Sequence, residues 1–214
     1  MITRDRYHRY TVDGGPPLPG VTSILKLQDC LIGGDLAAWG ARTALDYLKG
    51  QPGDTEGALA SVSAARDLGT AVHADVERVL TGLRPIGSPE HMTALTAFLV
   101  KERPEFLHVE QLVANVTVGY GGTFDFIARL RGKVAICDVK TGRLKASHRL
   151  QLAAYAAAER MGDAPMPRVR AYYVLLLRPN EYELIQLDVT AADKRHFKAL
   201  ARAYHRAKEW SDAS

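Results

Sequence analysis

Residues 121–142, with the sequence GGTFDFIARLRGKVAICDVKTG, restrict the fold of this chain more than any other segment. β-branched and aromatic residues cluster in two runs, 123–130 and 133–139, and the dipeptide Arg131-Gly132 separates them. Two such runs joined by a two-residue loop predict a pair of antiparallel strands, a β-hairpin. The register of this hairpin decides which of its polar side chains share one face of the sheet.

Counting outward from the turn pairs Leu130 with Lys133 and places Asp125 directly opposite Asp138. Directly opposed residues of a hairpin share one face, with their Cβ atoms about 5 Å apart. Lys140 projects from the same face because side chains alternate along a strand. Arg-Gly is not an ideal two-residue turn, and a slip of one residue would place the two acids on opposite faces.

Two carboxylates this close are costly unless a cation lies between them. At an effective dielectric constant of about 20, they repel by on the order of 3 kcal/mol. Asp125 and Asp138 also lie within strongly apolar runs, and burial raises the cost of an unpaired charge. The pair therefore favours a divalent cation such as Mg²⁺ or Mn²⁺, which binds few carboxylates and keeps several waters. The alternative is an ordinary cross-strand salt bridge with Lys140 on an exposed face.

The remaining chain predicts a mixed α/β fold in a single domain, since it shows neither internal repeats nor a low-complexity linker. Residues 1–32 are expected to be irregular or hairpin-like, and Val72, Val76, Val79 and Leu83 are spaced to face a core. Helices are expected at 35–49, 56–82, 89–101, 145–161 and 190–210, and strands at 108–118, 123–130, 133–139, 169–177 and 182–187. The domain would comprise a mainly helical portion (1–104), a sheet core (105–189) and a basic C-terminal helix (190–214).

The composition is that of a soluble globular protein, with 47% hydrophobic and 24% charged residues among 214. No apolar stretch reaches the roughly 20 residues of a membrane helix, and the N-terminus lacks the apolar run of a secretory signal. A cytoplasmic location without a membrane partner is therefore expected. Cys30 and Cys137 are too few for a disulfide framework, and Cys137 lies in an apolar run typical of a buried thiol.

A third group of polar residues follows the hairpin on a predicted helix, where Gln151 and Tyr155 share one face. The series Asp125, Asp138-x-Lys140 and Gln151-x-x-x-Tyr155 resembles the RecB-like branch of the PD-(D/E)XK nuclease superfamily. Residues 122–125 are similar to its G-x-x-D motif. Upstream, residues 69–73 (GTAVH), with Glu77 one turn later, resemble its histidine helix. The matching blocks span residues 69–155, and the resemblance implies a restriction-endonuclease-like fold, a mixed sheet flanked by helices, with the N-terminal helical portion narrowing access to the site.

The resemblance also implies roles for individual residues. Asp125 and Asp138 would bind the metal together with His73 and the backbone carbonyl of Val139. Lys140 would orient or help to deprotonate the attacking water and stabilise charge in the transition state. The residues that would position DNA or the lysine are Gln151 and Tyr155.

Two acids remain ambiguous in sequence. Glu110 either completes the metal site or is a solvated strand end, and Glu77 either supports His73 or pairs with a nearby arginine. Basic residues outside the motifs are candidate phosphate contacts, consistent with a net charge of +4 and a pI near 9.1. They comprise Arg143, Lys145 and Arg149 after the hairpin, and Lys194, Arg195, Lys198, Arg202, Arg206 and Lys208 near the C-terminus. The second group fits a solvated helix face equally well.

The resemblance implies a Mg²⁺- or Mn²⁺-dependent deoxyribonuclease, an exonuclease acting on single-stranded DNA or DNA ends in phage or bacterial recombination and repair. The alternatives are a structure-selective endonuclease of the same fold and a non-catalytic DNA-binding module. No cysteine follows Cys137, so the iron–sulfur cluster of some relatives is not expected. A phosphate-binding G-x-x-x-x-G-K-[ST] motif is also absent from the sequence, so no nucleotide cofactor is expected and helicase activity would come from a partner, as would a recombination function.

Overall fold

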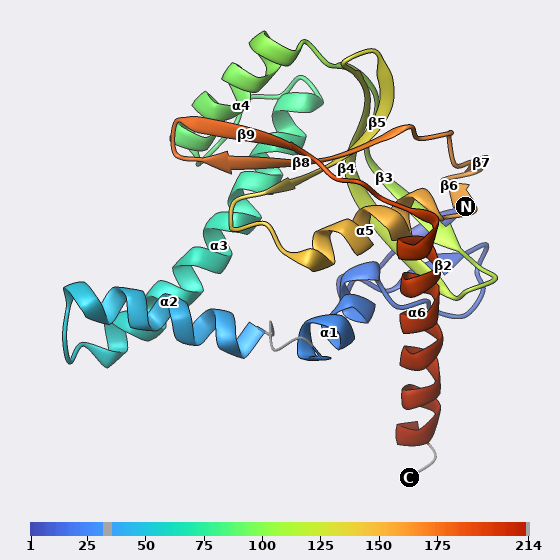
Figure 1. The fold of residues 1–214 in the computed structure, drawn as a ribbon, viewed down its shortest axis with the longest axis horizontal. Coiled ribbons are helices and arrows are strands. Elements are labelled where there is room, and N and C mark those ends of the chain that lie inside the picture. Colours follow the sequence, from blue (N-terminus) through green and yellow to red (C-terminus); the bar gives the residue numbers. More distant parts are fainter. Residues whose placement is uncertain (32–35, 213–214) are drawn as a thin grey trace.

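A seven-stranded mixed sheet forms the centre of the molecule in the computed structural model, which describes residues 1–31 and 36–212 (Figure 1). Its strands are β3 (Glu105–Asn115), β4 (Tyr120–Leu130), β5 (Lys133–Lys140), β6 (Arg160–Met161), β7 (Ala164–Pro165), β8 (Ala171–Arg178) and β9 (Glu181–Gln186). They lie in the order β7-β6-β3-β4-β5-β8-β9. β5 and β8 run parallel, and the other neighbouring strands are antiparallel. The mixed α/β fold expected from the sequence is confirmed.

Helices cover both faces of this sheet. On one face, α3 (Thr55–Leu80) and α4 (Pro89–Glu102) enclose an apolar cluster that includes Val72, Phe98 and Phe126. On the other face, α1 (Val21–Leu31), α5 (Ala146–Ala156) and α6 (Ala191–Asp212) enclose a second cluster around Ile136 and Phe197. Each large apolar side chain buried in this way stabilises the fold by roughly 1.5–3 kcal/mol.

Strand β5 takes part in both clusters because its side chains alternate between the faces. Cys137 and Val139 point into the cluster under α3 and α4, while Ile136 points toward α5. By the same alternation, Asp138 and Lys140 face the α5 side of the sheet. The strand thus carries two polar residues at the end of an otherwise apolar run.

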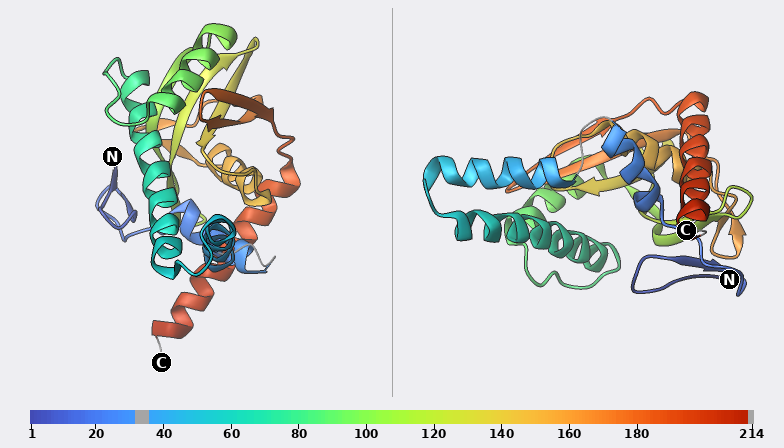
Figure 2. Two further views of the ribbon diagram at one scale, coloured as in Figure 1. Left: turned by 90° about the vertical axis from the view of Figure 1, so that its left-hand side faces the viewer. Right: turned by 90° about the horizontal axis from the view of Figure 1, so that it is seen from below.

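Helix α2 (Leu36–Gly50) packs antiparallel on the first half of α3, and the two helices project from the body of the molecule (Figure 2). Asp54 caps α3 by accepting a hydrogen bond from the Gly57 N–H. The second half of α3 returns to the sheet, where Val72 and Val76 are buried. This half carries His73 and Glu77 toward β3 and β4, in the middle of the sheet.

A small hairpin at the N-terminus packs beside the main sheet. Its strands are β1 (Ile2–Arg4) and β2 (Tyr10–Val12), and Ile2 and Tyr10 contact Ala114 of β3. The hairpin expected within residues 1–32 is therefore confirmed. The expectation of irregular structure in the rest of that segment is wrong, because Val21, Ile24 and Leu25 form the buried face of α1.

Several expected boundaries differ from the structure. The helix expected at 145–161 ends at Ala156, because residues 160–165 form the β6–β7 hairpin, which turns at Gly162 with a φ of +57°. The strand expected at 108–118 spans 105–115 instead, since the Asn115 side chain accepts the Val118 N–H and forms a turn. Leu83 is exposed rather than part of a core.

Other expectations concern residues only partly described. Cys137 is fully buried, as expected, while the side chain of Cys30 lies outside the described residues. The expected start of a helix at residue 35, and residues 213–214 of the C-terminal segment, also lie outside them. Within the described chain, no helix is both long enough and apolar enough to cross a membrane.

Candidate active site

The β4–β5 hairpin has the register that the sequence predicts. Its pairs run from Leu130 opposite Lys133 to Phe126 opposite Cys137. The turn residues Arg131 and Gly132 both have positive φ, +50° and +75°, as a type I′ turn requires. Arginine adopts this conformation at a cost, which its bidentate hydrogen bonds to the Glu102 carboxylate, at 2.7 and 2.8 Å, help to offset.

The strand pairing is interrupted at Asp125, on both sides of β4. One step beyond the last β4–β5 pair, the register places Asp125 opposite Asp138. There the Asp125 Oδ2 atom accepts the backbone N–H of Val139, with 2.5 Å between oxygen and nitrogen. On the β3 side, Glu110 lies opposite Asp125 and has a φ of +48°. Three neighbouring strands therefore present a row of acids, Glu110, Asp125 and Asp138, where the ladder is open.

Lys140 compensates part of this negative charge. Its Nζ atom lies 2.5 Å from the Asp138 Oδ2 atom, and both side chains are largely buried. That oxygen accepts no hydrogen bond of regular geometry, so the contact is an ion pair with spare acceptor capacity. Burial raises the pKa of Asp138 above its ordinary value. Burial alone would lower the pKa of Lys140, but the charges of Asp138 and Asp125 outweigh it and hold that pKa above its usual range.

His73 approaches the same carboxylates from α3. Its Nδ1 atom lies 3.4 Å from the Asp125 Oδ1 atom. Burial favours the neutral imidazole, but the adjacent Asp125 overrides this effect and raises the pKa of His73. Burial also acts to raise the pKa of Asp125, yet His73, Lys140 and the Val139 N–H leave it below its ordinary value. Asp125 is therefore held as a carboxylate.

These groups lie in a cleft of about 640 Å³. Glu77 and Glu110 also line it, and the charges of Asp125 and Glu77 both act on Glu110. Burial, followed by the charges of Asp125 and Glu77, raises the pKa of Glu110 to about 8. The cleft thus gathers four acidic side chains, Glu77, Glu110, Asp125 and Asp138, around one point, which is a setting suited to a bound cation.

Gln151 and Tyr155 form the α5 side of the cleft. The Gln151 Nε2 atom lies 2.9 Å from the Tyr155 hydroxyl, and both side chains are buried. Gly122 permits this packing, since a Cβ atom there would lie 2.6 Å from the Tyr155 ring. Burial raises the pKa of Tyr155 well above its usual value, so the hydroxyl stays protonated. The Gln151-x-x-x-Tyr155 motif and the G-x-x-D motif are therefore in direct contact.

The basic residues expected to contact DNA lie outside the cleft lining. Arg143 and Lys145 are exposed beyond the end of β5. Arg149 pairs with Asp193, with 3.0 Å between Nε and Oδ1, and so links α5 to α6. The basic residues of α6 do not line the cleft either, within the part of the chain that the structure describes. Val139 contributes its N–H to the site, while its side chain packs in the core.

One wall of the cleft lies outside the motifs recognised in the sequence. The N-terminal hairpin supplies Arg4, His8 and Tyr10, and further lining residues are Val21, Thr22, Arg66, Thr70 and Thr123. Thr123 lies within the G-x-x-D segment and could have been found there. The hairpin residues carry no comparable local signal, because a long-range contact brings them to β4.

The donor set suits a metal that needs few protein ligands. Among the described residues, no three His, Cys, Asp or Glu side chains form a ready-made metal cluster. A Mg²⁺ or Mn²⁺ ion, however, binds through one or two carboxylates and completes its shell with water and phosphate oxygens. Asp125 and Asp138 provide two such carboxylates, and the buried Oδ2 atom of Asp138, which the Lys140 ammonium contacts without a hydrogen bond of regular geometry, can also accept a cation. The residues therefore fit a divalent ion.

A comparison with protein families identifies the superfamily of this chain. A family model described as the PD-(D/E)XK nuclease superfamily matches residues 94–213, a range that contains Asp125, Asp138, Lys140, Gln151 and Tyr155. No curated protein matches the chain at a significant level. Among solved structures, an alkaline exonuclease (LHK-Exo) from Laribacter hongkongensis aligns with a TM-score of 0.43 and 14% identity, over 65% of this chain and 78% of that one.

Two further structures show distant likeness. The same exonuclease in complex with dAMP aligns with a TM-score of 0.41 and 15% identity, over 65% of this chain and 78% of that chain. The protein SSO0001 aligns with a TM-score of 0.33 and 18% identity, over 52% of this chain and 54% of that chain.

Proposed function

This chain belongs to the PD-(D/E)XK nuclease superfamily, and we propose that it is a divalent-metal-dependent nuclease that hydrolyses phosphodiester bonds in DNA. The observation that supports this proposal is the convergence of Asp125, Asp138 and Lys140 at an open point of the sheet, inside a cleft. Two carboxylates can bind a dication, and an ammonium group beside them can contact a substrate phosphate.

Asp125 and Asp138 would hold the metal, with the backbone carbonyl of Val139, His73 and Glu110 as flanking ligands. Asp125 is suited to this role because its pKa lies below its ordinary value, which keeps it ionised. When bound, Mg²⁺ or Mn²⁺ supplies a Lewis acid that polarises a phosphoryl oxygen and lowers the pKa of coordinated water. The Val139 N–H keeps the Asp125 carboxylate in one orientation.

Lys140 would act as a cation rather than as a general base. Its raised pKa keeps the ammonium protonated at neutral pH, so it donates hydrogen bonds and cannot accept a proton. An ammonium beside the reacting phosphate stabilises the negative charge that develops in the transition state and orients the attacking water. The sequence left open a second role, in which Lys140 deprotonates the attacking water. That role agrees less well with a raised pKa.

The remaining motif residues would position the substrate. The paired side chains of Gln151 and Tyr155 present an amide and a hydroxyl toward the cleft. Glu77 would support His73, which lies one helical turn away. Arg143 and Lys145 would contact phosphates outside the cleft, and Arg149 would act through its ion pair with Asp193, which fixes α6 against α5.

We further propose that the enzyme acts from DNA ends, as an exonuclease, in phage or bacterial recombination and repair with a helicase or recombination protein as partner. This part of the proposal rests on the resemblance of residues 69–155 to RecB-like exonucleases. The experiment compares linear single-stranded, linear double-stranded and covalently closed circular DNA, each with Mg²⁺, Mn²⁺ or a chelator. An exonuclease degrades the linear substrates and leaves closed circles unnicked, whereas an endonuclease nicks the circles.

The matched variants are Asp138→Asn and Asp188→Asn, the second at an exposed position outside the cleft. Asp138→Asn should abolish cleavage and metal binding while DNA binding survives, and Asp188→Asn should behave as the wild type. A wild-type protein that binds DNA without cutting it under any metal condition would instead be a binding module. Cleavage that persists with chelator or in Asp138→Asn would refute the proposed mechanism.

A further inference from the structure

The N-terminal hairpin forms a wall of the cleft that the nuclease motifs do not include. Arg4, His8 and Tyr10 all line the cleft, together with residues of α3. The sequence motifs begin only at residue 69, so this wall is a structural addition to them.

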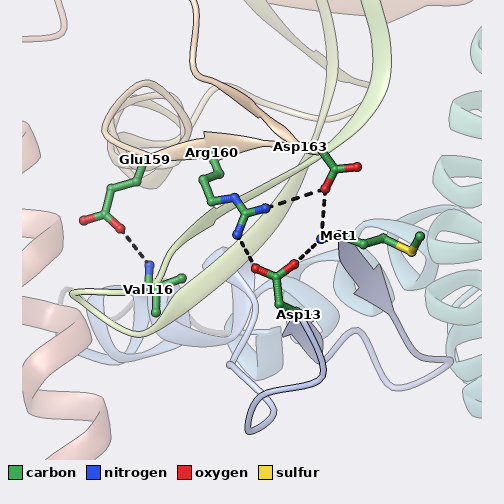
Figure 3. A network of polar contacts seen from close by, with 6 residues as sticks. All are labelled: Met1, Asp13, Val116, Glu159, Arg160 and Asp163. Atoms are coloured by element: carbon green, nitrogen blue, oxygen red, sulfur yellow. Dashed lines mark hydrogen bonds and ion pairs between the residues drawn. The ribbon is translucent and has the colours of Figure 1, made fainter.

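The hairpin is firmly attached to the sheet beside the acids. Tyr10 packs so closely on β4 that a Cβ atom at Gly121 would lie 2.4 Å from it. Its hydroxyl lies 3.1 Å from the Thr123 hydroxyl, two residues before Asp125. At the far end of the hairpin, Asp13 accepts a hydrogen bond from Arg160 of β6 at 2.6 Å (Figure 3). The wall is therefore fixed at both ends rather than loosely apposed.

Figure 3 shows that this attachment is a network rather than a single contact. The Met1 amino group contacts Asp13 and lies 2.8 Å from Asp163, while Arg160 approaches Asp163 at 3.6 Å. Charged groups of opposite sign thus connect the N-terminal hairpin with the β6–β7 hairpin. Each pair is exposed and weak alone, but together they restrict the motion of β1 and β2.

Arg4 brings positive charge into this fixed wall. Its Nη1 atom donates to the Thr123 hydroxyl at 3.1 Å, and its charge acts to lower the pKa of Glu110, another residue of the cleft. Within the part of the chain that the structure describes, no carboxylate forms an ion pair with Arg4. A guanidinium has several N–H donors, and one hydrogen bond to Thr123 leaves others directed at the solvent of the cleft.

The charges of the cleft indicate what these donors would bind. Four acids, Glu77, Glu110, Asp125 and Asp138, line it together with Arg4, Arg66 and Lys140. Lys140 pairs with Asp138 and would act on the reacting phosphate, so a neighbouring phosphate of the same strand needs another cation. A planar guanidinium matches the paired oxygens of a phosphate group better than any other side chain.

We propose that Arg4, held by Thr123 and the docked hairpin, binds a phosphate group of the DNA strand in the cleft and so positions that strand against the metal-binding acids. This inference rests on the proposed nuclease function and names the substrate contact made by the N-terminal wall. The phosphate is either an internal phosphodiester or a terminal phosphate, which share the same chemistry. Arg4 is a positioning residue and takes no part in the bond cleavage.

The test uses the variants Arg4→Ala, Arg4→Gln and Arg6→Ala in the full chain. Arg6 lies on the same hairpin, contacts Tyr7 and does not line the cleft, so it controls for loss of charge. DNA binding is measured by fluorescence anisotropy with Ca²⁺ or chelator, and cleavage is measured with Mg²⁺. Thermal unfolding confirms that each variant is folded.

Arg4→Ala and Arg4→Gln should raise Kd and KM roughly tenfold, with kcat changed by less than about threefold, because a charge-assisted contact to bound substrate is lost. The salt dependence of binding should fall by about one phosphate contact. Equal losses on circular single-stranded DNA and on linear DNA with 5′-hydroxyl ends identify an internal phosphodiester. A loss confined to linear DNA with a 5′- or 3′-phosphate identifies a terminal one.

Two failures are distinguishable. If the wild type cleaves DNA and the Arg4 variants match Arg6→Ala in Kd and KM, this inference is wrong and the proposed function stands. If the wild type neither binds nor cleaves any DNA, the proposed function fails and this inference fails with it. Since Arg4→Gln keeps a hydrogen-bonding side chain beside Thr123, a folding defect confined to Arg4→Ala leaves the test decisive.

Discussion

The backbone N–H of Val139 donates to the Asp125 carboxylate, with 2.5 Å between the nitrogen and Oδ2, at the point where β4 and β5 stop pairing. A side chain of one strand thus replaces a backbone acceptor in the ladder. This exchange satisfies a buried N–H that would otherwise cost free energy. It also fixes the orientation of Asp125, so the same contact serves both the fold and the site.

This double role predicts different effects for two substitutions of Asp125. Asp125→Asn keeps an oxygen that can accept the Val139 N–H, whereas Asp125→Ala leaves that N–H unsatisfied. Both variants should lose metal-dependent cleavage by about 10³-fold or more, because the carboxylate proposed to bind the metal is removed. Asp125→Ala should be less stable than Asp125→Asn by about 1–3 kcal/mol in urea unfolding with chelator present. Equal stability of the two variants would show that the Val139 contact contributes nothing to folding.

Lys140 and Asp138 form a largely buried ion pair, which predicts a stability effect of Lys140→Ala. Removing the ammonium leaves a buried carboxylate beside Asp125, so the metal-free protein should lose about 3 kcal/mol of unfolding free energy. Mg²⁺ or Mn²⁺ should restore part of that loss by neutralising the carboxylates. Cleavage should fall by on the order of 10²–10³-fold even with saturating metal, since the ammonium proposed to stabilise the transition state is absent.

The control for that prediction is Lys133→Ala, at an exposed position on the same strand. It should change stability by no more than about 0.5 kcal/mol and leave cleavage intact. If Lys140→Ala were as stable as Lys133→Ala in chelator, the Lys140–Asp138 ion pair would contribute nothing to the free energy of unfolding.

The register of the β4–β5 hairpin could be predicted because its information is local. A two-residue turn and a side-chain period of two place Asp125, Asp138 and Lys140 by counting alone. The Arg-Gly turn weakened that prediction, and the structure explains why it holds. Glu102, on α4, pairs with the Arg131 guanidinium and supports its left-handed backbone.

The N-terminal wall of the cleft could not be predicted in this way. Arg4 and Thr123 are 119 residues apart, and no local pattern links them. Arg149 shows that a tertiary partner cannot be read from local sequence either. Its position after the hairpin suggested a phosphate contact, and in the structure its guanidinium forms an ion pair with a distant acid, Asp193. Local periodicity identifies faces of strands and helices, whereas the partner across a tertiary contact depends on the whole fold.

The pKa of Glu110, raised to about 8 by burial and by the charges of Asp125 and Glu77, predicts a pH-dependent stability. In the unfolded chain this carboxyl ionises near its ordinary value of about 4.3. Between that pH and about 8, the unfolded state releases a proton that the folded state retains, so stability falls as pH rises. In chelator, Glu110→Gln should therefore be more stable than the wild type above pH 8, by on the order of 1 kcal/mol after solvent screening.

Thermal unfolding at pH 4 and pH 9 with chelator checks this prediction. The two proteins should differ little at pH 4, where the carboxyl is protonated in both states. Glu105→Gln, at an exposed position on the same strand, serves as the control and should show no such divergence. A wild type that matches Glu110→Gln at both pH values would contradict the predicted shift.

Gly122 and Tyr155 provide a steric test of the contact between the two motifs. An alanine Cβ at position 122 would lie 2.6 Å from the Tyr155 ring, and the ring is buried beside Gln151. Gly122→Ala should therefore displace Tyr155, break its hydrogen bond to Gln151 and cost about 1–3 kcal/mol of stability. Cleavage should fall with it, because α5 would move relative to Asp138 and Lys140.

The control is Gly87→Ala, where nothing lies within 4 Å of the added methyl group and the change should be nearly neutral. A Gly122→Ala protein as stable and active as Gly87→Ala would mean that the Tyr155 ring can shift freely, and that its packing against the G-x-x-D strand does not position the catalytic residues.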